Sequence, residues 1–161
     1  MVSTIYLSLD SVLAGAALCW FGLPKRYWLF ASSAIGFADG FALLCGWTMR
    51  NWIATTVTPL QQVVLFVGSA LAATIISKKC ANRPRLLIGA TAFLFSVDNL
   101  LAGAQLMSIK SAAQSVPTAA IFSALACFAG LCVAEPIKTR VRPQAWFALA
   151  SLAAGIRFLV P

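Results

Sequence analysis

Long apolar runs separated by short polar connections make up the chain. The runs cover about residues 2–23, 27–47, 57–77, 86–107, 117–134 and 144–160. Each run approaches the roughly 20 apolar residues that a helix needs to cross a bilayer core about 30 Å thick. Prolines fall at or near the proposed ends of the runs, at Pro24, Pro59, Pro84, Pro117, Pro136 and Pro143. The pattern predicts an all-α integral membrane bundle of six transmembrane helices.

Composition supports the same class of protein. Hydrophobic residues make up 61% of the chain, charged residues make up 10%, and the mean hydropathy is +0.89. An ordinary soluble domain does not have this composition. The first run has no basic start and contains Asp10, so we interpret it as a retained helix and not as a cleaved signal. We expect residues 1–161 to form a single membrane domain.

Basic residues concentrate in alternate connections. The connections after the first, third and fifth runs carry Lys25, Arg26, Lys78, Lys79, Arg83, Arg85, Lys138, Arg140 and Arg142, against Arg50, Lys110 and Arg157 on the other side. The positive-inside bias places the side with nine basic residues in the cytoplasm and both termini outside. This distribution also argues against a nucleic-acid partner, despite the net charge of +8. We expect a multi-pass protein of a cell membrane, of the bacterial inner-membrane type.

Acidic residues are rare, and their positions are informative. The chain has four, and Asp10, Asp39 and Asp98 lie inside apolar runs. A charged side chain at the centre of a membrane helix costs about 2.5 to 3.5 kcal/mol on insertion scales. Packing alone gives no reason to carry this cost three times, so these aspartates are the candidate functional residues.

Two of the aspartates lie in a repeated sequence. Residues 8–16 read SLDSVLAGA and residues 96–104 read SVDNLLAGA, and six of the nine positions are identical. The copies fall in the first and fourth runs, which cross the membrane in opposite directions. This arrangement is typical of the inverted 3+3 repeat of secondary transporters, whose site lies near the midplane between the halves. The predicted halves are residues 1–79 and 80–161.

A cluster of carboxylates in this setting points to cation chemistry. Repulsion and loss of hydration disfavour several buried charges together, so the cluster must bind a cation or take up protons. Oxygen ligands favour ions such as Mn²⁺, Mg²⁺ or Ca²⁺. The residues that would complete a shell around Asp10, Asp39 and Asp98 are Ser8, Ser11, Ser96, Asn99, Gln61 and Gln62. Serine and asparagine also form structural hydrogen bonds between membrane helices, and that alternative stays open.

Other site chemistries find little support in the sequence. The chain has no histidine, and its five cysteines form no CxxC pair, which excludes histidine-dependent triads and the usual zinc spacings. We interpret the cysteines as buried packing residues. We expect no enzymatic activity, no catalytic residues and no tightly bound cofactor.

The motifs around the aspartates resemble those of a known family, the MntP-type manganese efflux pumps of the LysE superfamily of six-helix exporters. SLD at residues 8–10, SVD at residues 96–98, and Asp39 ahead of Gly46 and Trp47 carry the resemblance. It implies cation export, with Asp10, Asp39 and Asp98 handling the ion. The chain departs from the family pattern in having Asp39 where glutamate is usual, and Ser11 and Asn99 where alanine is usual. The SVDN form is similar to cadmium-resistance relatives in the same superfamily.

The sequence therefore predicts a transporter that exports a divalent cation, Mn²⁺ first, in exchange for protons. Alternatives are a non-catalytic membrane subunit whose aspartates pair with basic residues of a partner, and an exporter of another small solute such as an amino acid. Intramembrane aspartyl proteolysis is a further alternative, but GFADG is only a loose match to the GxGD sequence of that class. Arg157 is a candidate partner for the aspartates. The working unit is left open between a monomer and a homodimer.

Overall fold

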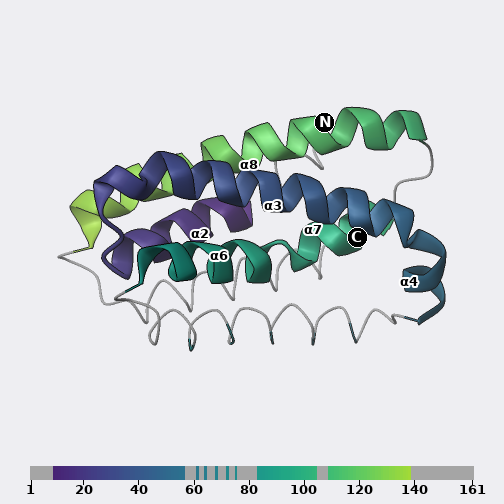
Figure 1. Ribbon diagram of the computed structural model, residues 1–161, viewed down its shortest axis with the longest axis horizontal. Coiled ribbons are helices and arrows are strands. Elements are labelled where there is room, and N and C mark those ends of the chain that lie inside the picture. The colour runs from purple at the N-terminus through teal and green to yellow at the C-terminus, as the bar shows by residue number, and fades with distance from the viewer. Residues whose placement is uncertain are drawn as a thin grey trace.

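The computed structural model describes residues 9–56, 83–104 and 109–138, together with residues 61, 64, 68, 72 and 75. Every element bounded within this part is a helix (Figure 1). The elements are α2 (Leu9–Trp20), the short 3-10 helix η1 (Lys25–Tyr27), α3 (Trp28–Thr48), α4 (Arg50–Thr56), α6 (Pro84–Phe95), α7 (Val97–Ala104) and α8 (Ile109–Ile137). The predicted spans 57–77 and 144–160 lie largely or wholly outside the described residues.

Three segments are long and apolar enough to cross a membrane. They are Lys25–Thr48, Pro84–Ala104 and Ala112–Ile137, and α2 contributes a shorter apolar helix. Large apolar side chains point outward from these segments, and Leu29, Phe37 and Phe93 are about three-quarters exposed, at 73%, 74% and 75%. An apolar surface of this kind is rare on soluble monomers and suits contact with lipid chains.

The interior of the bundle is built from α2, α3, α6 and α8. Its largest fully buried apolar side chains are Leu18, Ile35, Leu43, Leu87, Ile88 and Leu131. Of the described cysteines, Cys19 and Cys127 are buried, as predicted, whereas Cys132 is exposed on α8. Tryptophans mark the two ends of α3, since Trp28 begins the helix and Trp47 lies next to its last residue.

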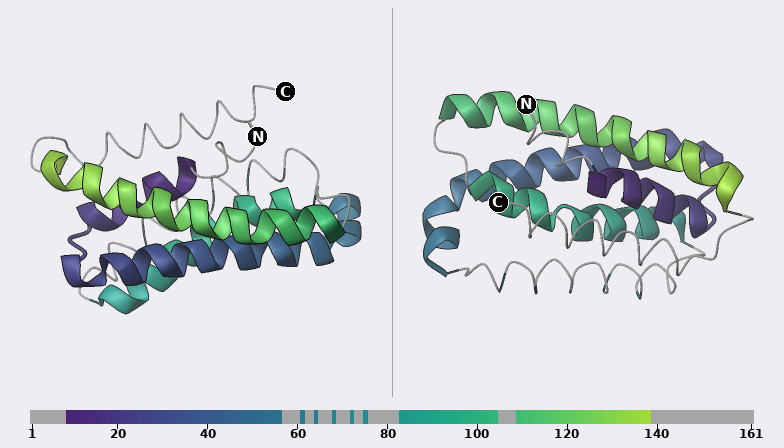
Figure 2. Two further views of the ribbon diagram at one scale, coloured as in Figure 1. Left: turned by 90° about the horizontal axis from the view of Figure 1, so that it is seen from above. Right: turned by 180° about the vertical axis from the view of Figure 1, so that it is seen from behind.

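Glycines bring the helices into backbone contact. On α3, Gly36 lies against Ala120 and Ala124 of α8, and Gly40 lies against Ala120 and Val116. Moving forward along α3 therefore moves backward along α8, so these two helices are antiparallel. Figure 2 shows them side by side over most of their length.

The two copies of the repeated sequence pack in the same way on different helices. Gly15 of the first copy meets the backbone of Cys127 in α8, and Gly103 of the second copy meets the backbone of Leu43 in α3. Each partner helix also carries a glycine at the contact: Gly130 of α8 meets the backbone of Val12, and Gly46 of α3 meets the backbone of Leu100. Each copy therefore uses its AGA segment to approach its partner helix closely.

The contacts also give the directions of the two copies. Ser96 contacts Asp39 and Gly103 contacts Leu43, so α7 runs parallel to α3. Gly15 contacts Cys127 and Cys19 contacts Glu135, so α2 runs parallel to α8. Because α3 and α8 are antiparallel, α2 and α7 run in opposite directions.

The fifth predicted span differs from the structure at its start. The sequence analysis placed Pro117 near the beginning of this span, but α8 begins at Ile109 and contains both Pro117 and Pro136. The prediction for Pro117 was wrong because the first two turns of α8 carry polar residues that lower the local hydropathy. A proline inside a membrane helix is tolerated when nearby groups satisfy the freed backbone. Pro117 leaves the carbonyl of Ala113 without its usual N–H donor, and Thr118 Oγ1 donates to the neighbouring carbonyl of Gln114 at 2.6 Å.

The fourth predicted span forms one membrane-length segment, Pro84–Ala104, with a one-residue interruption that the sequence pattern did not indicate. α6 ends at Phe95 and α7 begins at Val97, with Ser96 between them at φ −86° and ψ 1°. Side chains compete with the helix for backbone groups here, as Ser96 Oγ donates to the Ala92 carbonyl at 2.7 Å and the Asn99 N–H donates to Asp98 Oδ1 at 2.8 Å. The interruption falls within the SVD sequence, and backbone hydrogen bonds continue through it, from the Ser96 N–H to the Ala92 carbonyl at 3.2 Å and from the Leu100 N–H to the Ser96 carbonyl at 3.1 Å.

Candidate functional site

Asp39 occupies the middle of α3 and is only 1% exposed. Ser11 Oγ donates to its Oδ2 at 3.0 Å, and Ser96 Oγ donates to its Oδ1 at 2.6 Å. Ser123 of α8 also hydrogen-bonds to this carboxylate. Three hydroxyl groups from α2, the α6–α7 interruption and α8 thus surround one acid.

Asp10 and Asp98 form a second part of the same polar group. They are 7% and 6% exposed, and their carboxyl groups lie close enough to each other for strong electrostatic interaction. A hydrogen bond between them would require a proton on one of the two, since ionised carboxylates only accept. Asp39 lies near enough for electrostatic repulsion with both. The structure therefore brings together all three aspartates that the sequence analysis singled out.

Close helix packing explains how these side chains meet. Gly36 and Gly40 flank Asp39 by one turn or less; a side chain at Gly36 would overlap the backbone of α8, and one at Gly40 would be tight against Ala120. The close contact leaves Ser123 of α8 within hydrogen-bonding reach of Asp39. Small residues commonly let membrane helices approach in this way.

Some polar atoms in the group have no partner within the described part of the chain. Both amide atoms of Asn99, Nδ2 and Oδ1, are buried without a hydrogen bond, and so is Asp10 Oδ2. Asn99 itself is 0% exposed. Buried polar atoms are nearly always hydrogen-bonded, so these orphaned atoms call for an explanation.

The remaining predicted site residues lie in different places. Ser11 and Ser96 adjoin Asp39, and Gln61 is exposed, whereas Ser8, Gln62 and Arg157 lie outside the described residues. Within residues 9–56, 83–104 and 109–138, no three acidic or cysteine side chains are arranged to hold one metal ion together. A cation at this group would therefore also need neutral oxygen ligands.

Ser123 belongs to the group, but the sequence analysis did not identify it. Its place in α8 matches that of Asp39 in α3, because Leu43 and Gly46 of α3 correspond in their contacts to Cys127 and Gly130 of α8. Aligning residues 36–46 with residues 120–130 would have paired Asp39 with Ser123. That signal is weak, since only Ala42 and Gly46 have identical counterparts.

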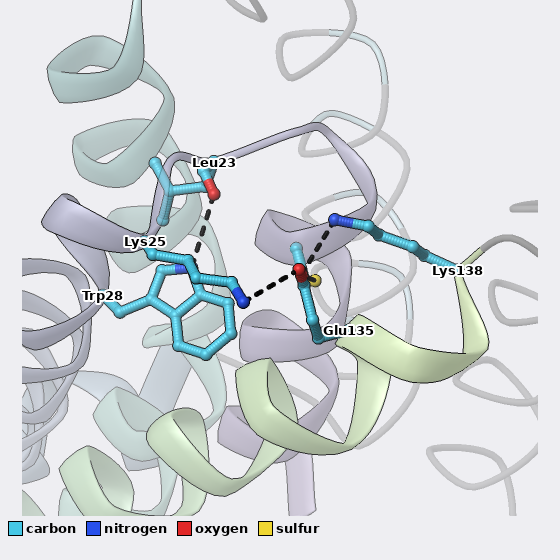
Figure 3. Close-up of polar contacts among 6 residues, drawn as sticks. Leu23, Lys25, Trp28, Glu135 and Lys138 are labelled. Atoms are coloured by element: carbon cyan, nitrogen blue, oxygen red, sulfur yellow. Dashed lines mark hydrogen bonds and ion pairs between the residues drawn. The ribbon is translucent and has the colours of Figure 1, made fainter.

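Glu135 forms a separate polar cluster at one end of the bundle (Figure 3). Lys25 Nζ lies 3.3 Å from its Oε1, Lys138 Nζ lies 2.8 Å from its Oε2, and the Cys19 thiol donates to Oε2 at 3.3 Å. The hydrogen bond to this carboxylate raises the pKa of Lys138. The cluster ties the connection between α2 and α3 to the end of α8. The sequence analysis assigned no role to Glu135.

Comparison with known proteins returns no match: no family model, no curated protein and no solved structure corresponds to the chain. The class of protein therefore follows from the fold and the site alone. The chain is an all-helical membrane protein with at least three helices able to span a bilayer. Its buried acidic group is formed by residues of α2, α3, α7 and α8 and by Ser96, which joins α6 to α7.

Proposed function

We propose that this protein is a membrane transporter that exports a divalent cation, with Mn²⁺ as the first candidate, in exchange for protons. The single observation that carries the proposal is the convergence of Asp10, Asp39 and Asp98 between apolar helices. Each is at least nine-tenths buried, and the recorded contacts of Asp10 and Asp39 with other described residues are to hydroxyl and carboxyl groups. Buried acids inside a membrane bundle typically mark ion pathways or proton relays.

The donor set supports a hard or borderline cation. Carboxylate, hydroxyl and amide oxygens are the ligands that Mg²⁺, Ca²⁺ and Mn²⁺ prefer, whereas soft ions prefer thiolates. Of the buried thiols, Cys19 donates to Glu135, outside the group, whereas Cys127 lies near enough to Asp39 for electrostatic interaction. The proton is the proposed counter-ion because a proton on Asp10 or Asp98 would relieve the repulsion between these two buried carboxyl groups.

We further propose that the chain is an inverted 3+3 repeat of six spans. Supporting observations are the opposite directions of α2 and α7 and the matching contacts of Gly15 and Gly103. The interruption at Ser96 adds to them, since broken helices form the binding sites of many such transporters. Rocking of one half against the other would expose the aspartate group to each side in turn.

The test is transport by the purified protein in liposomes. We expect the wild type to move Mn²⁺ across the bilayer, and we expect Asp10→Asn and Asp98→Asn to abolish this flux, because each removes an ionisable oxygen from the group. Glu135→Gln is the matched control, since it makes the same acid-to-amide change outside the group and should preserve flux.

Undiminished flux in both aspartate variants would overturn the role of the group. Absence of divalent-cation flux in the wild type would overturn the export proposal, and a membrane subunit that needs a partner would give that result. Acceleration by an imposed proton gradient is the expected sign of proton exchange.

A further inference from the structure

Asn99 is the buried polar residue that the hydrogen bonds of the site leave unused. It is fully buried, and neither atom of its amide has a partner in the described part of the chain. A buried polar atom without a hydrogen bond is destabilising, so an amide with two such atoms is unfavourable unless something binds it.

The helix face shows where the amide points. Ser96, Asn99 and Gly103 follow the three- and four-residue spacing of a single helix face. Ser96 bonds to Asp39 and Gly103 lies against Leu43, so both ends of this face meet α3. Asn99 lies between them and therefore faces the part of α3 that carries Asp39.

The repeated sequence gives an independent indication. Asn99 takes the place in SVDNLLAGA that Ser11 takes in SLDSVLAGA. Ser11 points into the acidic group and donates to Asp39. In the second copy the equivalent side chain is longer and carries a carbonyl oxygen, yet it makes no hydrogen bond to its surroundings among the described residues.

The acidic group also lacks ligands that Asn99 can supply. Asp39 is occupied by three serine hydroxyls, and no three acidic side chains of the described residues are arranged around one point. Asp10 and Asp98 offer a pair of carboxyls, of which Asp10 Oδ2 is unpartnered. A six-ligand oxygen shell around a divalent ion would need neutral oxygens beside this pair.

We propose that the transported cation is held between Asp10, Asp98 and the Asn99 amide oxygen, while Asp39 and its serines form the adjoining wall of the site. This inference rests on the proposed function and narrows its ion site. The amide oxygen is a hard, neutral ligand, so it favours Mn²⁺, Mg²⁺ or Ca²⁺ over Cd²⁺.

The experiment measures Mn²⁺ binding to the purified protein by the loss of the free-ion signal in electron paramagnetic resonance. We expect Asn99→Ala to weaken binding by about 10- to 100-fold, the range seen when groups around a metal are removed. Asn99→Asp keeps an oxygen in the same place and should bind Mn²⁺ at least ten times more tightly than Asn99→Ala. Ser32→Ala removes a buried hydroxyl two turns from Asp39 and should leave binding unchanged.

Equal binding by Asn99→Ala and the wild type would overturn the role of Asn99, as would an Asn99→Asp variant that binds as weakly as Asn99→Ala. If Asn99→Ala does not fold, Asn99→Leu takes its place: we expect it to bind Mn²⁺ more weakly than Asn99→Asp, and equal binding by these two variants would overturn the role of Asn99. Failure of the wild type to bind Mn²⁺, Mg²⁺ or Ca²⁺ would overturn the proposed function itself. The inference on Asn99 fails by itself, with the proposed function intact, if the wild type binds Mn²⁺, Asp98→Asn loses the binding and Asn99→Ala keeps it.

Discussion

At the scale of single residues, serine hydroxyls make the buried Asp39 tolerable. A carboxylate that loses its water needs hydrogen-bond donors, and Ser11, Ser96 and Ser123 supply them from three different parts of the chain. Ser96 differs from the others, because its single hydroxyl proton is shared between Asp39 and the Ala92 carbonyl at the helix interruption. Its hydroxyl therefore links the interruption between α6 and α7 to the Asp39 carboxylate of α3.

Replacing Ser96 by alanine tests this link. The change removes a hydrogen bond to a buried carboxylate, and we expect the free energy of unfolding in detergent to fall by about 1.5 to 3 kcal/mol. Ser33→Ala, at an exposed position of α3, should change it by less than about 0.5 kcal/mol. Equal stability of the two variants would show that Ser96 contributes nothing to holding Asp39.

At the scale of helices, glycines control how the site is assembled. Gly15 and Gly103 occupy the same position in the two copies, and each lies directly on the backbone of a partner helix. A side chain there cannot be accommodated by a rotamer change, because the neighbouring atoms are backbone. The AGA segments thereby set the distance between the aspartates of one helix and the groups of the next.

Gly103→Ala should force α7 away from α3 and lower the free energy of unfolding by about 1 to 3 kcal/mol or more, as overpacking does. Gly89→Ala is the matched control. Gly89 lies in α6 with nothing among the described residues near its missing side chain, and alanine there should stabilise the helix by about 0.5 to 1 kcal/mol. Unfolding titrations in the same detergent measure both changes. Stabilisation by Gly103→Ala would contradict the close contact.

At the scale of the whole molecule, the helix ends separate into two groups. α3 and α6 begin at the end of the bundle where α8 finishes, and the Glu135 cluster lies at that end (Figure 1). α4 and the start of α8 lie at the opposite end. Arg26 and Arg85 belong to the first end and Asn51 to the second, as the alternating basic connections predict.

Labelling with a membrane-impermeant maleimide tests this arrangement. In a cysteine-free background, we expect Arg26→Cys and Arg85→Cys to react from the same face of intact cells or inverted vesicles, and Asn51→Cys to react from the other face. The positive-inside bias predicts that the first face is cytoplasmic. Reaction of Arg26→Cys and Arg85→Cys from opposite faces would contradict the fold.

The sequence by itself determined the membrane class, the approximate positions of the described helices and the importance of three aspartates. The length of an apolar run and the cost of burying a charge are local properties that the sequence records directly. Hydropathy placed the described helices well, but it misplaced Pro117 and did not indicate the one-residue interruption at Ser96 within the Pro84–Ala104 segment. There the outcome depends on which side-chain hydroxyls satisfy backbone groups, and hydropathy does not record that.

Only the tertiary structure decided which side chains each acidic residue contacts. It places three serines, including Ser123, around Asp39, puts Asp10 beside Asp98, and leaves the Asn99 amide without a partner among the described residues. It also places Glu135 in a separate cluster with two lysines. These assignments depend on contacts between residues far apart in the chain. Such contacts follow from the glycine-mediated approach of α2, α3, α7 and α8, which a sequence pattern does not specify.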